Sequence, residues 1–250
     1  MSQNLSILYQ DEDLIAVNKP AGMLVHRGER SEEDRPILLQ TLRDQLGQKV
    51  YPVHRLDRMT SGVIVLALNS ETASLMVDQW RNKSVEKRYF AVTRGYMPEH
   101  VHLDYAMAPP VDKFKKNPKP KPVQEAITDF YCLGQVEIPV EIDKYPQSRY
   151  SLVEALPKTG RKHQIRRHLK HLSHPIIGDT RYGKGKHTQY FRDHLNCAQM
   201  LLHAWKLSFE HPYTGQTMCL YAQLNETWWS IIQTFGWTQS LPEEVSRSPL

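Results

Sequence analysis

Hydrophobic and polar positions follow two periods along the chain, which divide it into short strands and amphipathic helices. Residues 5–9 and 14–18, separated by the acidic turn 11–13, predict a β-hairpin. Pro36 opens and Gly47 ends a predicted helix, because proline suits the first helical position and glycine the residue after the last. The apolar positions of this helix are Leu38, Leu39, Leu42 and Leu46.

The same two periods continue to the C-terminal region. Further strands are predicted over residues 63–68, 88–93, 126–133, 150–156, 201–209 and 218–223. Further helices are predicted from the cap Ser70 through Trp80, over 164–172, and around Trp228 to Phe235. Strands joined by short turns, with helices between some of them, predict an α+β fold whose mixed, largely antiparallel sheet is flanked by helices and loops around a central cleft.

We expect a single domain over residues 1–237 and a flexible tail over 238–250, which is polar and contains prolines. The segment 109–122 is rich in proline and lysine and predicts a flexible basic loop, since proline cannot donate to a sheet ladder.

Composition narrows the class of protein. No stretch approaches the roughly 20 apolar residues that span a bilayer, and the N-terminus lacks the layout of a signal peptide. The three cysteines are far apart in sequence and form no metal or disulfide pattern, which favours a reducing compartment. We therefore expect a cytoplasmic protein with no membrane association and no metal.

Charge is unevenly distributed. The net charge is +5 and the sequence pI about 9.0. Two basic stretches, between Glu154 and Asp179 and between Asp112 and Glu125, contain no acid at all. A single basic stretch would be read as an ordinary solvent-exposed face. Two of them, together with the arginines on either side of Asp57, indicate a partner with a phosphate backbone. The cations of these stretches are Lys113, Lys115, Lys116, Lys119, Lys121, Lys158, Arg161, Lys162, Arg166, Arg167 and Lys170.

The segment 54–62, His-Arg-Leu-Asp-Arg-Met-Thr-Ser-Gly, carries the clearest chemistry. Asp57 lies between Arg55 and Arg58, and the predicted strand 63–68 follows directly. Neighbouring cations favour an ionised carboxylate, and small residues let the backbone approach a ligand. An ionised acid beside anion-binding arginines predicts a nucleophile or base that acts on a phosphate-bearing molecule.

Two nucleotide-binding motifs fail on inspection. Residues 178–185 imitate a P-loop, but Gly185 replaces the Ser/Thr that would hold magnesium, and we interpret the segment as a turn. His54-Arg55 before Asp57 imitates a kinase catalytic loop, but Leu56 intervenes and the other kinase motifs are absent from the sequence. Residues 160–169 instead predict a cationic helix start after a tight turn, which suits phosphate.

Taken together, these motifs resemble the RluA family of pseudouridine synthases. The resemblance covers about residues 7–235, in the family's order. It rests on Lys19-Pro20, on His54 to Arg58, on Lys87-Arg88-Tyr89, on Gly160 to Arg166 and on Pro175 to Gly183. The fold it implies is that of the pseudouridine synthase catalytic domain.

The resemblance also implies roles for single residues. Asp57 matches the catalytic carboxylate, Arg166 the arginine that pairs with it, and Tyr89 the tyrosine that stacks on the target uracil. Arg55 matches the arginine that fills the RNA stack after the target base flips out, and Ile165 a wall of the uracil pocket. The remaining expected RNA contacts are Arg58, Lys87 and Arg161.

Within this family the resemblance favours a tRNA substrate, modified at uridine 65, and it implies no cofactor. Many relatives carry an S4-like RNA-binding domain before the catalytic one, but the first strand here begins within ten residues, so we expect no such domain. The simplest expectation for the oligomeric state is a monomer with no obligate protein partner.

Three alternatives stay open. One is a pseudouridine synthase of the same family that acts on rRNA. Another is a non-catalytic RNA-binding protein or RNA chaperone that has kept the cleft. The third is an enzyme that uses the acid to hydrolyse RNA.

Overall fold

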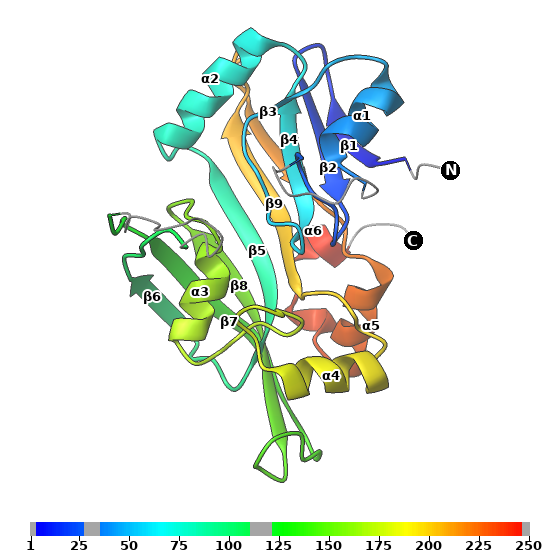
Figure 1. Ribbon diagram of the computed structural model, residues 1–250, viewed down its shortest axis with the longest axis vertical. Coiled ribbons are helices and arrows are strands. Elements are labelled where there is room, and N and C mark those ends of the chain that lie inside the picture. The colour runs from blue at the N-terminus through cyan, green and yellow to red at the C-terminus, as the bar shows by residue number, and fades with distance from the viewer. Residues whose placement is uncertain (1–3, 28–35, 111–121, 247–250) are drawn as a thin grey trace, which may run out of the picture.

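A computed structural model describes residues 4–27, 36–110 and 122–246 (Figure 1). Ten strands of these residues form one sheet in the order β1-β2-β4-β9-β5-β8-β7-β6, with β10 beside β9 and β3 beside β4. The strands are β1 (Ser6–Gln10), β2 (Leu14–Lys19), β3 (Tyr51–Pro52), β4 (Ser61–Ala67), β5 (Glu86–Arg94), β6 (His100–Asp104), β7 (Ile127–Ile138), β8 (Ser148–Pro157), β9 (Leu202–Glu210) and β10 (Thr217–Tyr221). The helices are α1 (Leu38–Leu46), α2 (Ser70–Arg81), α3 (Gln164–His171), α4 (Gly185–His194), α5 (Glu226–Thr234), the 3₁₀ helix η1 (Thr238–Ser240) and α6 (Glu243–Ser246).

The sheet is mixed and mostly antiparallel, which confirms the predicted fold class. β1 and β2 form the expected hairpin. Parallel pairing joins β4 to β9, where Ser61 is opposite His203 and Gly62 opposite Ala204. This pairing joins the part of the sheet built on β1, β2 and β4 to the part built on β5, β8 and β7.

Alternation along β5 gives the sheet two covered faces. Phe90 and Val92 belong to a core that α4 and α5 complete, whereas Ala91 belongs to a second core completed by Ile165 and Leu169 of α3. Successive strand residues point to opposite faces, so one strand serves both cores. As a result α3 is anchored against the middle of the sheet.

A third core lies around β2 and β4 and is covered by α1 and α2. α1 matches the predicted helix, and Gly47 ends it in the left-handed conformation at φ 68°. The cap of α2 lies one residue before the expected one: the side chain of Asn69, rather than that of Ser70, accepts a hydrogen bond from the Thr72 amide. Asparagine is as good a cap as serine, so the sequence pattern alone did not separate them.

Several elements were not anticipated from the sequence. β3 has only two residues and pairs with β4. β6 is a short strand at the edge of the sheet, paired with β7. α4 begins at Gly185, the last residue of the segment expected to be a turn, and buries only His187 and Phe191. β6 and α4 are short and mostly polar, so their periodic signal was weak.

The C-terminal region differs from the expected flexible tail. Leu241 and Val245 are buried in the core that Trp228 of α5 helps to form, and η1 and α6 cover that core. Burial of these two apolar residues holds the otherwise polar stretch against the core. The lysines 113–121 of the expected basic loop lie outside the described residues. No helix in the described part of the chain has the length and apolar character needed to cross a membrane.

Candidate active site

The loop that carries Asp57 is fastened to the rest of the molecule by Lys19. The Lys19 ammonium is buried and donates hydrogen bonds to the carbonyl oxygens of Pro20 (2.8 Å), Met23 (2.9 Å) and Arg58 (3.1 Å). Burial lowers the pKa of Lys19 to about 7, although the Asp57 carboxylate opposes this. The lysine therefore joins the end of β2 to the backbone next to Asp57.

His54 fastens the start of the same loop. Its Nε2 accepts a hydrogen bond from the Val65 amide at 3.0 Å, and its ring stacks on Trp80 with centroids 4.6 Å apart. Burial, together with the charge of Lys87, lowers the pKa of His54 to about 3. A neutral, hydrogen-bonded ring orders the loop and is poorly suited to carry protons near neutral pH.

The turn before α3 is organised by Gln164. Its side-chain oxygen accepts hydrogen bonds from the Thr159 hydroxyl (2.8 Å) and the Arg161 amide (2.9 Å). Its side-chain nitrogen donates to the carbonyl of Ile127 and the hydroxyl of Thr128 on β7, both at 2.9 Å. All hydrogen-bonding groups of this amide face protein partners, so the turn is held firmly on the sheet.

Asp57 and Arg166 are in direct contact. Arg166 Nη1 donates to Asp57 Oδ2 at 3.0 Å, while Nε and Nη2 donate to the two carboxylate oxygens of Asp179 at 2.7 and 2.8 Å. The Arg166 side chain is 8% exposed and that of Asp57 22%, so the pair lies at the boundary between core and solvent. Burial alone would lower the pKa of Arg166, but Asp179 and Asp57 raise it above its ordinary value.

Asp179 is held in turn by its own backbone turn. Its Oδ1 accepts hydrogen bonds from the amides of Arg181 (2.9 Å) and Tyr182 (3.0 Å). Burial opposes ionisation of Asp179, but the hydrogen bonds and charge of Arg166 hold its pKa below the usual range. A Cβ at Gly183 would lie 2.3 Å from the Asp179 carbonyl oxygen, so this tight turn requires glycine there.

His163 approaches the other oxygen of Asp57. Its Nε2 lies 3.8 Å from Asp57 Oδ1, and its Nδ1 is 3.0 Å from the Tyr182 hydroxyl. Burial lowers the pKa of His163 to about 4, and Asp57 only partly offsets this. The ring is therefore neutral near pH 7, and Asp57 has one permanently charged partner in direct contact, Arg166.

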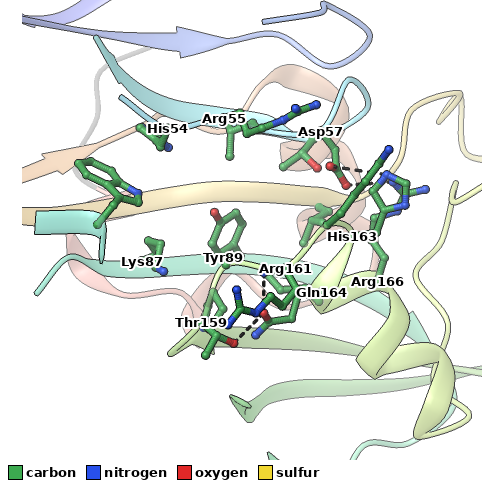
Figure 2. Close-up of a pocket in the computed structure, with 18 residues that line it drawn as sticks. His54, Arg55, Asp57, Lys87, Tyr89, Thr159, Arg161, His163, Gln164 and Arg166 are labelled. Atoms are coloured by element: carbon green, nitrogen blue, oxygen red, sulfur yellow. Dashed lines mark hydrogen bonds and ion pairs between the residues drawn. The ribbon is translucent and has the colours of Figure 1, made fainter. Parts of the chain in front are cut away.

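These groups border a cleft of about 400 Å³ (Figure 2). Asp57, His163 and Arg166 converge at one end of it, Tyr89 lies in the middle, and Lys87 and His54 lie toward the other end. Seven of the eight residues singled out from the sequence line this cleft: Asp57, Arg166, Tyr89, Arg55, Ile165, Lys87 and Arg161.

Arg58 is the exception among the expected residues. Its side chain is exposed and does not line the cleft. Its carbonyl oxygen accepts hydrogen bonds from Lys19 Nζ and from the Gly22 amide. The backbone of Arg58 therefore shapes the Asp57 loop, and its guanidinium points to solvent outside the cleft.

The middle of the cleft suits a flat, polar ring. Burial and the nearby Asp57 carboxylate raise the pKa of Tyr89, so its phenol keeps its proton and acts as a donor. Burial lowers the pKa of Lys87 to about 8, which still leaves it mostly charged at neutral pH. Ile165 adds an apolar wall.

Sequence reasoning missed four organising residues: Lys19, His163, Gln164 and Asp179. All four belonged to motifs that carried the family resemblance, but none had been assigned a task. Asp179 offered one signal, because it is the first acid after the long basic stretch that contains Arg166. Among the described residues no group of three or more His, Cys, Asp or Glu is arranged to hold a metal ion.

Residues 13–171 match the family of RNA pseudouridylate synthases, and the chain therefore belongs to this family. The protein is thus a pseudouridine synthase, an isomerase, which confirms the family expected from the sequence motifs. It is 48% identical over 239 residues to tRNA pseudouridine synthase C of Vibrio cholerae, which covers 95% of this chain and 98% of that protein. It is 45% identical over 241 residues to tRNA pseudouridine synthase C of Salmonella typhi, which covers 96% and 93%.

Solved structures support the fold. Human RNA Pseudouridylate Synthase Domain Containing 1 superposes with a TM-score of 0.68 at 22% identity, covering 94% of this chain and 96% of that one. Human RNA Pseudouridylate Synthase Domain Containing 4 gives a TM-score of 0.68 at 25% identity, covering 92% and 93%. The arrangement of the sheet described above is therefore that of a pseudouridine synthase domain.

Proposed function

We propose that this protein converts a uridine of tRNA, at position 65, to pseudouridine, and that Asp57 is the catalytic carboxylate. The observation that carries the proposal is the contact between Asp57 and Arg166 at the end of a cleft of nucleoside size. The tRNA substrate is supported by relatives 45–48% identical over nearly the whole chain that are named tRNA pseudouridine synthase C.

The reaction breaks the bond between uracil N1 and ribose C1′, turns the base, and joins C5 to C1′. Either role open to Asp57, attack or removal of a ribose proton, needs an ionised carboxylate. Arg166 supplies the compensating charge at 3.0 Å. C5 gives up its proton to solvent and N1 takes up a proton. No redox change occurs and no other group leaves the substrate, so the chemistry requires no cofactor.

The target base must leave its helix to reach this carboxylate. Flipping a base out of a stack costs a few kcal/mol, and something must compensate for the lost stacking. Tyr89, in the middle of the cleft, offers a ring for the uracil, and Arg55, exposed at its border, offers a planar group for the vacated stack. Lys87 and Arg161 supply charge for the adjacent phosphates.

Replacing Asp57 with Asn tests the proposal. The amide keeps the shape but cannot ionise, so we expect pseudouridine formation in a tRNA transcript to fall by at least about 10³-fold with RNA binding retained. Tritium release from uridine labelled at C5 measures the reaction, and Asp78→Asn, at an exposed position on α2, is the matched control.

Four outcomes would contradict the proposal. Equal modification by wild type and Asp57→Asn would remove the catalytic role of this residue. Faster modification of rRNA than of tRNA would favour the ribosomal substrate. Binding without any reaction would favour an RNA chaperone, and cleavage of the RNA strand would indicate a hydrolase. Mapping pseudouridine in RNA from cells that lack the protein identifies the position.

A further inference from the structure

A second cavity, of about 580 Å³, lies where the end of β5 meets the β7–β8 hairpin and α4. It shares no lining residue with the catalytic cleft. The side chains that matter here are Arg94, Tyr96, Asp143, Tyr145, Arg149 and His187. We propose that this cavity binds an unpaired nucleotide of the RNA substrate, separate from the nucleotide that is isomerised.

The floor of the cavity is positively charged, and its side chains are held by hydrogen bonds. Arg94 Nε donates to Nε2 of the buried His187 at 3.0 Å, and His187 Nδ1 lies 2.9 Å from the Tyr150 hydroxyl. Burial and the charge of Arg94 lower the pKa of His187 to about 4, so the ring is neutral and accepts from Arg94. The ion pair from Arg94 Nη2 to Asp143 is long, at 3.9 Å, and leaves donor capacity for a phosphate.

The walls of the cavity carry aromatic rings beside cations. Tyr96 is 39% exposed and Tyr145 54%, so both rings are accessible to a bound base. The Arg149 guanidinium lies 5.0 Å from the Tyr96 ring, and Lys144 Nζ lies 4.9 Å from the Tyr145 ring. Exposed rings paired with cations form the platforms on which unpaired bases stack while their phosphates are neutralised.

Asp143 is the acid among the lining residues, and it indicates which hydrogen-bonding group the bound nucleobase carries. A carboxylate repels phosphate but accepts hydrogen bonds from an amino group, such as N4 of cytosine. Two arginines line the cavity with this one acid. Arg149 Nε is paired with Glu137 at 2.6 Å, and Lys186 Nζ lies 3.6 Å from Asp143. With Glu137 and Lys186 counted, these side chains still carry a net positive charge, and the other nitrogens of Arg149 stay available to a phosphate. An unpaired base that carries an exocyclic amino group therefore fits the cavity better than uracil does.

The position of the cavity suits an RNA already bound at Asp57. The Arg94 amide donates to the Pro175 carbonyl at 3.0 Å, and four residues later the chain reaches Asp179, the partner of Arg166. From Asp179 to His187 is eight residues, at most about 29 Å. In Figure 1 the connection between the end of α3 and the start of α4 contains the first part of this stretch. The exposed cations along it are Arg181, Lys184 and Lys186.

This inference rests on the proposed function, and steady-state kinetics with a tRNA transcript tests it. We expect the double variant Tyr145→Ala, Arg149→Gln to raise KM for tRNA about tenfold, because one stacked base and one phosphate contact are lost, while kcat stays within about twofold. Arg149→Gln alone should reduce the slope of log affinity against log salt by about one.

The matched control is Tyr131→Ala, Arg81→Gln, which removes an exposed tyrosine of β7 and an exposed, ion-paired arginine of α2. An unchanged KM in the Tyr145/Arg149 variant, a fall in kcat alone, or an equal rise in KM in the control would overturn the inference. Failure of the wild type to form pseudouridine would instead overturn the proposed function, so the two failures are distinguishable.

Discussion

Arg166 holds two carboxylates at once, and the geometry of the catalytic cleft depends on this double pairing. Asp179 takes the Nε and Nη2 side of the guanidinium and leaves Nη1 for Asp57. Fork-shaped pairing of this kind fixes the plane of an arginine as well as its charge. Asp179 therefore determines the direction from which positive charge reaches Asp57.

Replacing Asp179 with Asn should disturb this arrangement without touching the cleft directly. The amide presents a donor to one of the arginine donors, so Arg166 should rotate away from Asp57. We expect kcat to fall about tenfold or more, with a smaller change in KM for tRNA, and a loss of about 2 kcal/mol or more in the free energy of unfolding.

Steady-state kinetics and urea unfolding measure the two effects. Asp193→Asn, at an exposed position on α4, is the control and should change neither quantity. A normal kcat in Asp179→Asn would show that Asp57 does not need an oriented partner.

At the scale of elements, the parallel contact between β4 and β9 determines where the Asp57 loop ends. Gly62 has φ 114°, and a Cβ there would lie 2.1 Å from the Ala204 carbonyl oxygen. Beside it, the Ser61 hydroxyl bonds His203 Nδ1 at 2.9 Å. The glycine that ends the segment 54–62 is therefore required by the approach of β9, in addition to any approach of a ligand.

Gly62→Ala should consequently destabilise the fold strongly. The added methyl group must move the backbone of β9, so we expect a loss of about 3 kcal/mol or more. Gly47→Ala is the control: Gly47 also has a positive φ, 68°, but open space around it, and should lose only about 1 kcal/mol. Urea denaturation compares them, and equal losses would show that backbone conformation alone explains the effect.

Most elements could be predicted because the apolar residues within each of them recur with the spacing of a helix or of a strand. α1 and the β1–β2 hairpin match the expectation closely. β6 carries the alternating pair Val101 and Leu103, yet five residues at a sheet edge gave too little pattern to stand out. In α4 the buried positions are only His187 and Phe191, so a helix held mainly by its surroundings was missed.

For the whole molecule, several buried histidines make stability depend on pH. Burial lowers the pKa of His203 to about 4, and the same cause acts on His163 and His187. The folded pKa lies below the unfolded value of about 6.5, so the unfolded chain binds more protons between pH 4 and 6.5. Stability is therefore full above about pH 6.5 and falls as the pH drops toward 4.

In the variant His203→Gln, the free energy of unfolding should fall less steeply as the pH drops. His203 is buried, and its Nε2 bonds the Ala222 carbonyl at 3.1 Å, which an amide can also do. Charging the buried ring costs about 3 kcal/mol at most, and the variant removes that contribution. Urea midpoints from pH 7 to pH 4.5 measure the slope, and His100→Gln, at an exposed position, should leave it as in wild type.

By itself the amino-acid sequence determined the elements whose apolar spacing is their own, the excess of positive charge, and the motifs that identify a pseudouridine synthase. It also led us to expect that Asp57 and Arg166 meet, and they do, although they are 109 positions apart. Their catalytic roles stay predictions. Only the tertiary structure decided that Asp179 orients Arg166, that Lys19 fastens the loop, and that Arg58 points out of the cleft. The reason is physical: spacing reports which residues share a face of one element, whereas hydrogen bonds between elements depend on how the sheet brings those elements together.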